Sequence, residues 1–303
     1  MSLHVYATVV TPEGVASNNK GESEGNTGCL QKITVKTGES TCKELVINSS
    51  PAIKFAIRED FTEKGLSVNR TYNKETDDFE YKDDARVSWN EKDKGKYVDD
   101  DVLGFMVTKE RESKDKKGTC AKRKGALDMC RALSLSEFEG DRVFGAKAGS
   151  KSDTSLHNSE VCYTRFQYTS GMTPESLARK ENATESIDSI ICLNHVGGNH
   201  SRDYYDMSPE SIIFRMTHDP APRIMNIYRT GEDGEVTAPN LVRLIKSGDV
   251  KASEIYIGGP LANDDDIKSI EGIHLFGGVK QASKKFIEDM NTKLGVDYVY
   301  EMR

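Results

Sequence analysis

The chain has 303 residues, enough to bury a substantial core as one large domain with insertions or as two smaller domains. Hydrophobic residues make up 36% of it and charged residues 30%, so a sizeable part should lie in exposed loops around the core. A formal net charge of −7 excludes a generally basic nucleic-acid-binding coat, although phosphate binding needs only a local stripe of cations and amides.

The six cysteines are scattered without a Cys-x-x-Cys pair, which is typical of free thiols in a reducing compartment. The sequence begins without a basic leader and contains no apolar stretch long enough to span a bilayer. We therefore expect a cytoplasmic protein.

The N-terminal region is predicted to begin with strands. Residues 3–11 alternate apolar and polar positions, which indicates a strand with one buried face. A polar, glycine-punctuated loop at 17–32 should follow this strand. Two further extended runs, at 30–35 and 45–47, lead into the first helix.

The strongest helix signal lies between Ser50 and Gly65. Ser50 is the expected N-cap, Pro51 suits the first helical position, and Gly65 can close the end. Apolar residues at helical spacing should face the core: Ile53, Ala56, Ile57 and Phe61.

Residues 66–98 lose periodicity and fill with polar side chains, which predicts an inserted subdomain. Asp99, Asp100 and Asp101 then precede an apolar strand at 102–107. Three consecutive carboxylates suggest a metal site or a solvated strand entry. The second interpretation is favoured because no histidine or further carboxylate cluster stands beside them.

The middle of the chain combines a basic run with extended segments. The basic side chains of residues 109–124 can either bind phosphates or simply be exposed to solvent in a loop. Residues 126–133 should be extended, and 139–159 should form a protruding loop or long hairpin. The alternation over 161–169 indicates a strand with one polar face, and a helix is predicted from Thr184 towards Gly197.

A second polar loop at 199–202 follows that helix. Strands are then predicted at 212–216 and 224–228. The tail is expected to add two helices and a strand, at 241–246, 281–294 and 255–257.

The strongest signals give the order strand, helix, strand, strand, helix, strand, which is the ferredoxin-like arrangement of RNA-recognition modules. This α+β arrangement also carries many unrelated functions. The aromatic stacking motif of the standard RNA-recognition domain is missing from the predicted central strands, so we expect any nucleic acid to bind loops instead of the sheet face. A single domain over 1–303, with insertions, fits these signals.

The polar segment 17–32 can wrap a sugar-phosphate backbone, because amides offer donors and acceptors and glycine lets the main chain approach closely. An ordinary solvated turn uses the same residue types, so composition alone leaves both interpretations open.

Several blocks occur together in a fixed order. They are Ser17-Asn18-Asn19-Lys20-Gly21-Glu22, Gly25-Asn26, Leu30-Gln31-Lys32, 99–106, 122–127 leading to 140–142, 160–168, 197–202, Tyr205-Asp206, and 208–211 to Arg215. Together these blocks resemble the backbone subunit of type I CRISPR surveillance (Cascade) complexes, in the DevR-type branch. Lys20 stands where members of that family often carry arginine, which keeps the charge but loses the bidentate fork.

The resemblance implies a ferredoxin-like (RRM-like) palm with a fingers insertion at 66–98 and a thumb-like loop at 139–159. It implies copies of the chain stacked head to tail along guide crRNA, which pairs with target DNA, beside other Cascade subunits. No catalytic residue, metal or other cofactor is implied. Because such a subunit holds any guide, its contacts should fall on phosphate and sugar. The expected RNA-binding residues are Ser17, Asn18, Asn19, Lys20, Gln31, Lys32, Arg58, Arg123, Lys124, Asn199, His200 and Arg202.

The loop of Asn199, His200 and Arg202 can grip the same strand from the other side or meet the neighbouring subunit, and the sequence leaves both open. A rival function is an endoribonuclease on the same fold, with His200 and either Tyr204 or Lys32 as a metal-free acid–base pair. A histidine that only hydrogen-bonds RNA or backbone is favoured, because no Ser/Cys-His-Asp constellation is present.

A zinc site is also conceivable from the sequence. Cys192, His195 and His200 lie close together, and Cys162 is available elsewhere. This spacing matches no standard knuckle, so we do not expect structural zinc.

Overall fold

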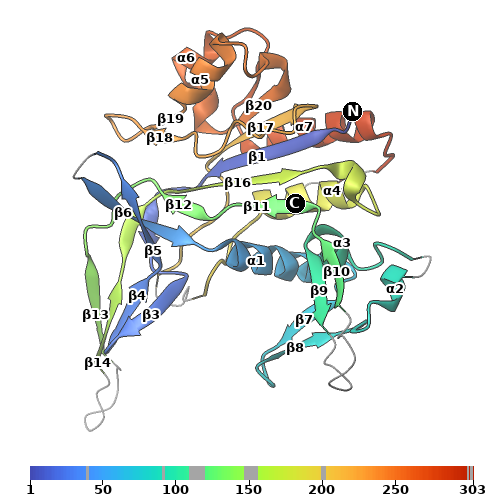
Figure 1. Ribbon diagram of the computed structural model, residues 1–303. Coiled ribbons are helices and arrows are strands. Elements are labelled where there is room, and N and C mark those ends of the chain that lie inside the picture. Colours follow the sequence, from blue (N-terminus) through green and yellow to red (C-terminus); the bar gives the residue numbers. More distant parts are fainter. Residues whose placement is uncertain are drawn as a thin grey trace.

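The computed structural model describes residues 1–38, 41–90, 93–108, 120–146, 156–198, 203–298, 300 and 303, arranged as in Figure 1. Within these residues a nine-stranded sheet has the order β21-β20-β17-β1-β16-β12-β6-β5, with β11 also paired to β16. Its strands are β1 His4–Val10, β5 Lys32–Lys36, β6 Cys42–Asn48, β11 Leu127–Met129, β12 Ala132–Ser134, β16 Phe166–Met172, β17 Ser211–Thr217, β20 Ile255–Gly258 and β21 His274–Phe276. The mixed α+β class predicted from the sequence is confirmed.

The N-terminal strand β1 lies in the middle of this sheet, antiparallel to β16 on one side and to β17 on the other. The sequence predicted one buried face, but both faces of β1 are largely buried. Val5 and Val9 pack in the main core, whereas Tyr6 and Val10 pack against a second apolar cluster built from the C-terminal region. The second apolar cluster comes from residues far along the chain, so the sequence of β1 alone could not predict that its second face would be buried.

The three longest described helices contribute to the main core on one face of the sheet: α1 (Ser50–Glu63), α4 (Asn182–Ile191) and α7 (Val279–Leu294). The fully buried Ile53, Ile57 and Phe61 of α1 confirm the predicted core stripe. Phe286 of α7 stacks on Phe214 of β17, with ring centroids 4.4 Å apart.

The N-cap of helix α1 lies one residue before the predicted cap, Ser50. Ser49 is the N-cap, and its side chain accepts a hydrogen bond from the backbone N–H of Ala52. Gly65, with φ of 73°, supplies the left-handed turn beyond the other end. We expect Ser49→Ala to lower the free energy of unfolding by about 1 kcal/mol, measured by urea denaturation. Ser23→Ala serves as the control, because Ser23 is an exposed serine in a strand away from this helix; an equal loss there would contradict the assignment.

The predicted strand at 102–107 is wrong at its start. Asp99, Asp100 and Asp101 lie in a short helix, α3 (Val98–Val102), and β9 begins only after it, at Gly104–Thr108. The left-handed φ of Gly104, 75°, makes the turn between them, and a Cβ there would collide with the backbone of Gly125 at 2.4 Å.

Three other predicted elements differ from the structure. The helix predicted from Thr184 to Gly197 begins at Asn182 and ends at Ile191. Residues 224–228 form no strand; their apolar side chains anchor an irregular segment in the second cluster. The run 161–169 divides into β15 (Cys162–Thr164), which pairs with β2 (Gly14–Ala16), and β16, whose residues are nearly all buried, the polar ones included. In each case tertiary packing overrides the local pattern.

Two arms leave the sheet on either side of α1 (Figure 1). The first arm is a four-stranded sheet in the order β13-β14-β4-β3, which joins the early hairpin to the segment predicted as a thumb. The second arm contains two hairpins, β7–β8 and β9–β10, and a short helix, α2. The bounds are β3 Lys20–Glu24, β4 Thr27–Leu30, β7 Arg70–Asn73, β8 Asp78–Tyr81, α2 Val87–Asn90, β10 Cys120–Lys124, β13 Arg142–Ala146 and β14 Leu156–Glu160.

The remaining elements are short and mostly C-terminal. They are the 3-10 helices Pro174–Ser176, Ala252–Glu254 and Pro260–Asn263, the strands β18 Arg229–Thr230 and β19 Val236–Thr237, and the helices α5 Pro239–Lys246 and α6 Asp265–Lys268. No helix among the described residues is both long and apolar enough to cross a membrane.

Candidate nucleic-acid interface

The predicted polar loop 17–32 is largely a hairpin, because β3 and β4 occupy most of it. Asn18 and Asn19 precede the hairpin and are buried. The amide of Asn18 donates to Asn48 Oδ1 (3.1 Å) and to the carbonyl of Val196 (2.9 Å). The amide of Asn19 donates to the carbonyl of Ile47 (2.9 Å). These side-chain amides therefore fasten the loop to β6 and to the segment around 196, and Ser17 beside them is also fully buried.

The cations of this segment lie where the first arm meets the sheet. Lys20 donates to the hydroxyl of Ser159, and Gln31 donates to the carbonyl of Lys20 at 3.4 Å. Lys32 Nζ lies 2.9 Å from Glu160 Oε2 and 4.1 Å from the ring centroid of Phe138. Lys20, Gln31 and Lys32 are thus brought together, and their donors are turned partly towards protein groups.

Glu160 is the centre of this junction, and sequence reasoning missed it. Its side chain is buried, and Oε2 accepts hydrogen bonds from the backbone N–H of Leu30 and from Lys32, both at 2.9 Å. Arg142 of β13 lies 3.8 Å from the other carboxylate oxygen. One carboxylate therefore connects β4, β5 and both strands of the predicted thumb. A carboxylate directly before an apolar strand was its only signal in the sequence.

The three consecutive aspartates form neither a solvated entry nor a metal site. Each carboxylate is buried and faces a different arginine: Asp99 with Arg58 (3.3 Å), Asp100 with Arg86 (3.2 Å) and Asp101 with Arg123 (2.6 Å). Burial raises the pKa of Asp100 to about 6, although Asn69 and Arg86 favour its ionised form. Among the described residues, no group of three or more histidine, cysteine or acidic side chains is placed to hold a metal ion.

Arg58 and Arg123 are consequently occupied within the fold. Arg58 lies inside, between α1 and α3, and not at the surface with Lys20 and Lys32. Arg123 also stacks over the ring of Trp89, at 4.1 Å from the centroid. Lys124 differs, because its side chain is 80% exposed and its partner Asp128, at 3.0 Å, is also exposed. Such an exposed pair leaves the lysine accessible to a phosphate.

The described residues do not include Asn199, His200 and Arg202, so the second predicted loop lies outside them. The same is true of residues 109–119 of the basic run and of residues 147–155 in the predicted thumb.

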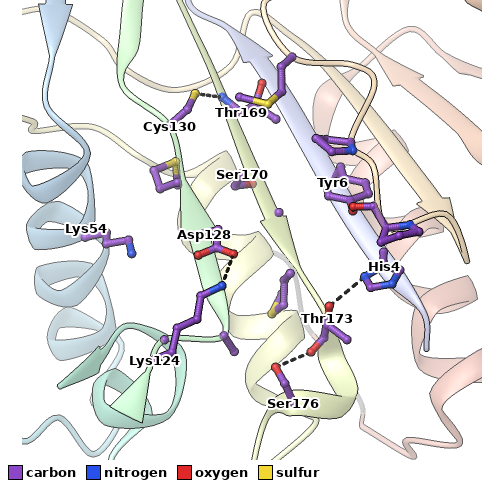
Figure 2. A pocket seen from close by; sticks show the side chains of 18 of the residues that line it. His4, Tyr6, Lys54, Lys124, Asp128, Cys130, Thr169, Ser170, Thr173 and Ser176 are labelled. Atoms are coloured by element: carbon purple, nitrogen blue, oxygen red, sulfur yellow. Dashed lines mark hydrogen bonds and ion pairs between the residues drawn. The ribbon is translucent and has the colours of Figure 1, made fainter. Parts of the chain in front are cut away.

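The structure adds one feature that sequence reasoning missed, a hollow of about 730 Å³ on the sheet face opposite α1, α4 and α7. Figure 2 shows side chains from β1, β11 and β16 facing into it, with Lys54 of α1 at one edge. We name it the sheet hollow. It is lined by His4, Tyr6, Lys54, 123–126, 128–130, 169–173, Ser176, Pro220, Pro222 and Met225. Arg123 and Lys124 are the predicted site residues that line it.

Comparison with known proteins first gives the class. The chain has the fold of proteins solved within CRISPR RNA-guided surveillance complexes. One structure titled "CRISPR RNA-guided surveillance complex" matches with a TM-score of 0.56 at 13% identity, covering 96% of this chain and 100% of that one. Another, titled "CRISPR RNA-guided surveillance complex, pre-nicking", matches with a TM-score of 0.55 at 11% identity, covering 95% and 100%.

Sequence comparison gives the family. A protein of Myxococcus xanthus (strain DK1622), described as "CRISPR-associated protein Cas7/Cst2/DevR", is 35% identical over 297 residues, which cover 94% of this chain and 96% of that protein. The chain belongs to the Cas7/Cst2/DevR family of CRISPR-associated proteins. The resemblance noted in the sequence is thereby confirmed. No family model matches the sequence.

Proposed function

We propose that this protein is a non-catalytic, RNA-binding backbone subunit of a type I CRISPR Cascade complex. It oligomerises along guide crRNA and presents that guide for pairing with target DNA, in the cytoplasm and in antiviral defence. The observation that carries this proposal is family membership over nearly the whole chain, combined with a fold shared with proteins of RNA-guided surveillance complexes. The other Cascade subunits are its further partners.

We propose that the palm is ferredoxin-like. In support, the strands β17, β1, β16 and β11 are neighbours in that order, and each pairs antiparallel with the next. Helix α1 lies between β1 and β11 in the chain, and α4 lies between β16 and β17. This is the strand-helix-strand-strand-helix-strand order of that fold. The second arm then corresponds to the fingers and the first arm to the thumb.

The guide is expected to pass the junction of the first arm with the sheet, where Lys20, Gln31 and Lys32 gather. Contacts from lysine and amide groups to phosphate and sugar carry no sequence information, which suits a subunit that must accept any guide. Copies that meet through two different surfaces form an open helical array, and such an array can follow one RNA strand.

We expect the purified protein to carry RNA and to form a salt-sensitive oligomer. Replacing both Lys20 and Lys32 with alanine should weaken binding of single-stranded RNA to a similar degree for every sequence. The salt slope should fall by about 0.7 for each phosphate group that the variant no longer neutralises. Fluorescence anisotropy with oligouridine and oligoadenine measures both effects.

The matched control is Lys280→Ala with Lys284→Ala, two exposed lysines of α7. Circular dichroism of each variant verifies folding. If the double variant of Lys20 and Lys32 binds RNA with unchanged affinity, the guide follows a different path.

The rival function is cleavage of guide precursor or target RNA by an acid–base pair that includes His200. Incubating the protein with both RNAs, with and without His200→Ala, separates the two functions. Specific cleavage that disappears in the variant would overturn the non-catalytic proposal.

A further inference from the structure

We propose that the sheet hollow binds one nucleotide unit, with its phosphate at Lys54 and its base against the apolar side chains at the opposite wall. This rests on the proposed function, since it assigns a second contact to a protein that handles single-stranded nucleic acid. The nucleotide can come from a bound strand or from a free nucleotide in solution.

The floor of the hollow is the sheet itself. Along β1, Val5 and Ala7 point into the main core, so His4 and Tyr6 point to the opposite face. Beside Tyr6 lies Gly171 of β16, where a Cβ would come within 2.8 Å of the Tyr6 ring. The absence of a side chain at Gly171 therefore lets the Tyr6 ring lie directly against β16 and leaves the space above it open. The volume of about 730 Å³ is in the range of small-ligand sites.

The charge of the lining favours an anion. Lys54, Arg123 and Lys124 line the hollow with Asp128 as the carboxylate among them, in a chain that is acidic as a whole. Arg123 is paired with Asp101, and Lys124 is paired with Asp128. Among the described residues, Lys54 has no carboxylate within ion-pair distance, which leaves its charge without direct compensation.

The position of Lys54 strengthens this point. Figure 2 shows its side chain extending from α1 towards β11, the strand that carries Asp128. Burial lowers the pKa of Lys54, and the charge of Asp128 only partly opposes this effect. A half-buried ammonium group without a counter-ion is stabilised when a phosphate binds beside it.

The opposite wall suits a base. Pro220, Pro222 and Met225 come from the irregular segment that follows β17, and Met225 is 46% exposed. On the floor, the rings of His4 and Tyr6 are nearly parallel, with centroids 6.4 Å apart and an interplanar angle of 16°. Flat and thioether groups of this kind pack against any base without reading its identity. An acidic peptide would use Lys54 but would leave this apolar wall unfilled.

The test compares wild type with Lys54→Ala and Met225→Glu in the full chain. End-labelled oligouridine and oligoadenine are titrated by fluorescence anisotropy, and AMP is measured by equilibrium dialysis. We expect Lys54→Ala to weaken binding of the probe that occupies the hollow by about 10- to 100-fold, the effect of removing one charge-assisted hydrogen bond. Met225→Glu should act in the same direction by placing a carboxylate on the wall. Lys246→Ala, an exposed lysine on α5, is the matched control and should change neither probe.

Cross-linking with thiouridine-substituted RNA locates the contact independently of affinity. We expect adducts on peptides that contain Tyr6, Met129 or Met225. Loss of oligonucleotide affinity assigns the hollow to a strand, whereas loss of AMP binding alone assigns it to a free nucleotide. If wild type binds RNA but neither variant affects either probe and the adducts lie only on the first arm, the inference fails while the proposed function stands. If wild type binds no RNA, the proposed function fails, and AMP binding that requires Lys54 would still support the hollow.

Discussion

Asp101→Ala is expected to lower the free energy of unfolding by about 3–5 kcal/mol, the usual cost of removing one partner from a buried ion pair. The Asp101 side chain is 0% exposed and accepts hydrogen bonds from four groups. Besides Arg123, these are the backbone N–H groups of Ala178 (2.9 Å) and Arg179 (3.1 Å) and the amide of Asn182 (2.9 Å). Alanine would leave all four donors without this acceptor, and the second arm would lose its fastening to α4.

Urea denaturation, followed by far-ultraviolet circular dichroism, measures this loss. Asp128→Ala is the matched control, because Asp128 also pairs with a cation but its side chain is 67% exposed. We expect that variant to change stability by less than about 1 kcal/mol. A loss of similar size in both variants would show that burial of the Asp101 pair does not increase its contribution to the free energy of unfolding.

The second large effect is expected from Glu160→Gln. Glutamine keeps the size of the side chain but removes the charge that faces Lys32. Because the pair is nearly buried, stability should fall by about 1–3 kcal/mol. At the same time Lys32 loses the counter-ion that competes with phosphate for its charge. Single-stranded RNA should therefore bind more tightly at low salt, with a salt slope steeper by about 0.7.

Fluorescence anisotropy across a salt series measures this gain. Glu137→Gln is the control, since Glu137 pairs with Lys43 at 3.4 Å and both side chains are well exposed. Tighter binding in both variants would point to net charge in general. Unchanged affinity and slope in Glu160→Gln would place Lys32 away from the RNA and leave its pair with Glu160 as a purely structural contact.

Elements with a strong local pattern were predictable from the sequence. The strands β1 and β17 and the apolar stripe of α1 all appear in the structure close to their predicted bounds. The Asp99–Asp101 run shows why other features were not. Its environment depends on Arg58, Arg86 and Arg123, which come from three separate segments, and one sequence gives no means of pairing them.

The partners of the residues at the candidate interface also come from distant segments, so the sequence could not predict them either. Residue type correctly indicated hydrogen-bonding amides at Asn18 and Asn19, but their partners, Asn48 and the carbonyls of Ile47 and Val196, are parts of the protein itself. The sheet hollow was missed because its walls come from β1, β16 and the segment after β17. Lys54 was visible in the sequence only as a polar residue on an amphipathic helix.

The central place of β1 has a consequence for synthesis. This strand is synthesised long before its partners β16 and β17, which begin only at Phe166 and Ser211. Until then, its apolar residues and both of its hydrogen-bonding edges are open to other nascent chains. A fragment that stops before β16 should therefore be prone to aggregation, because β1 then has neither of its partner strands.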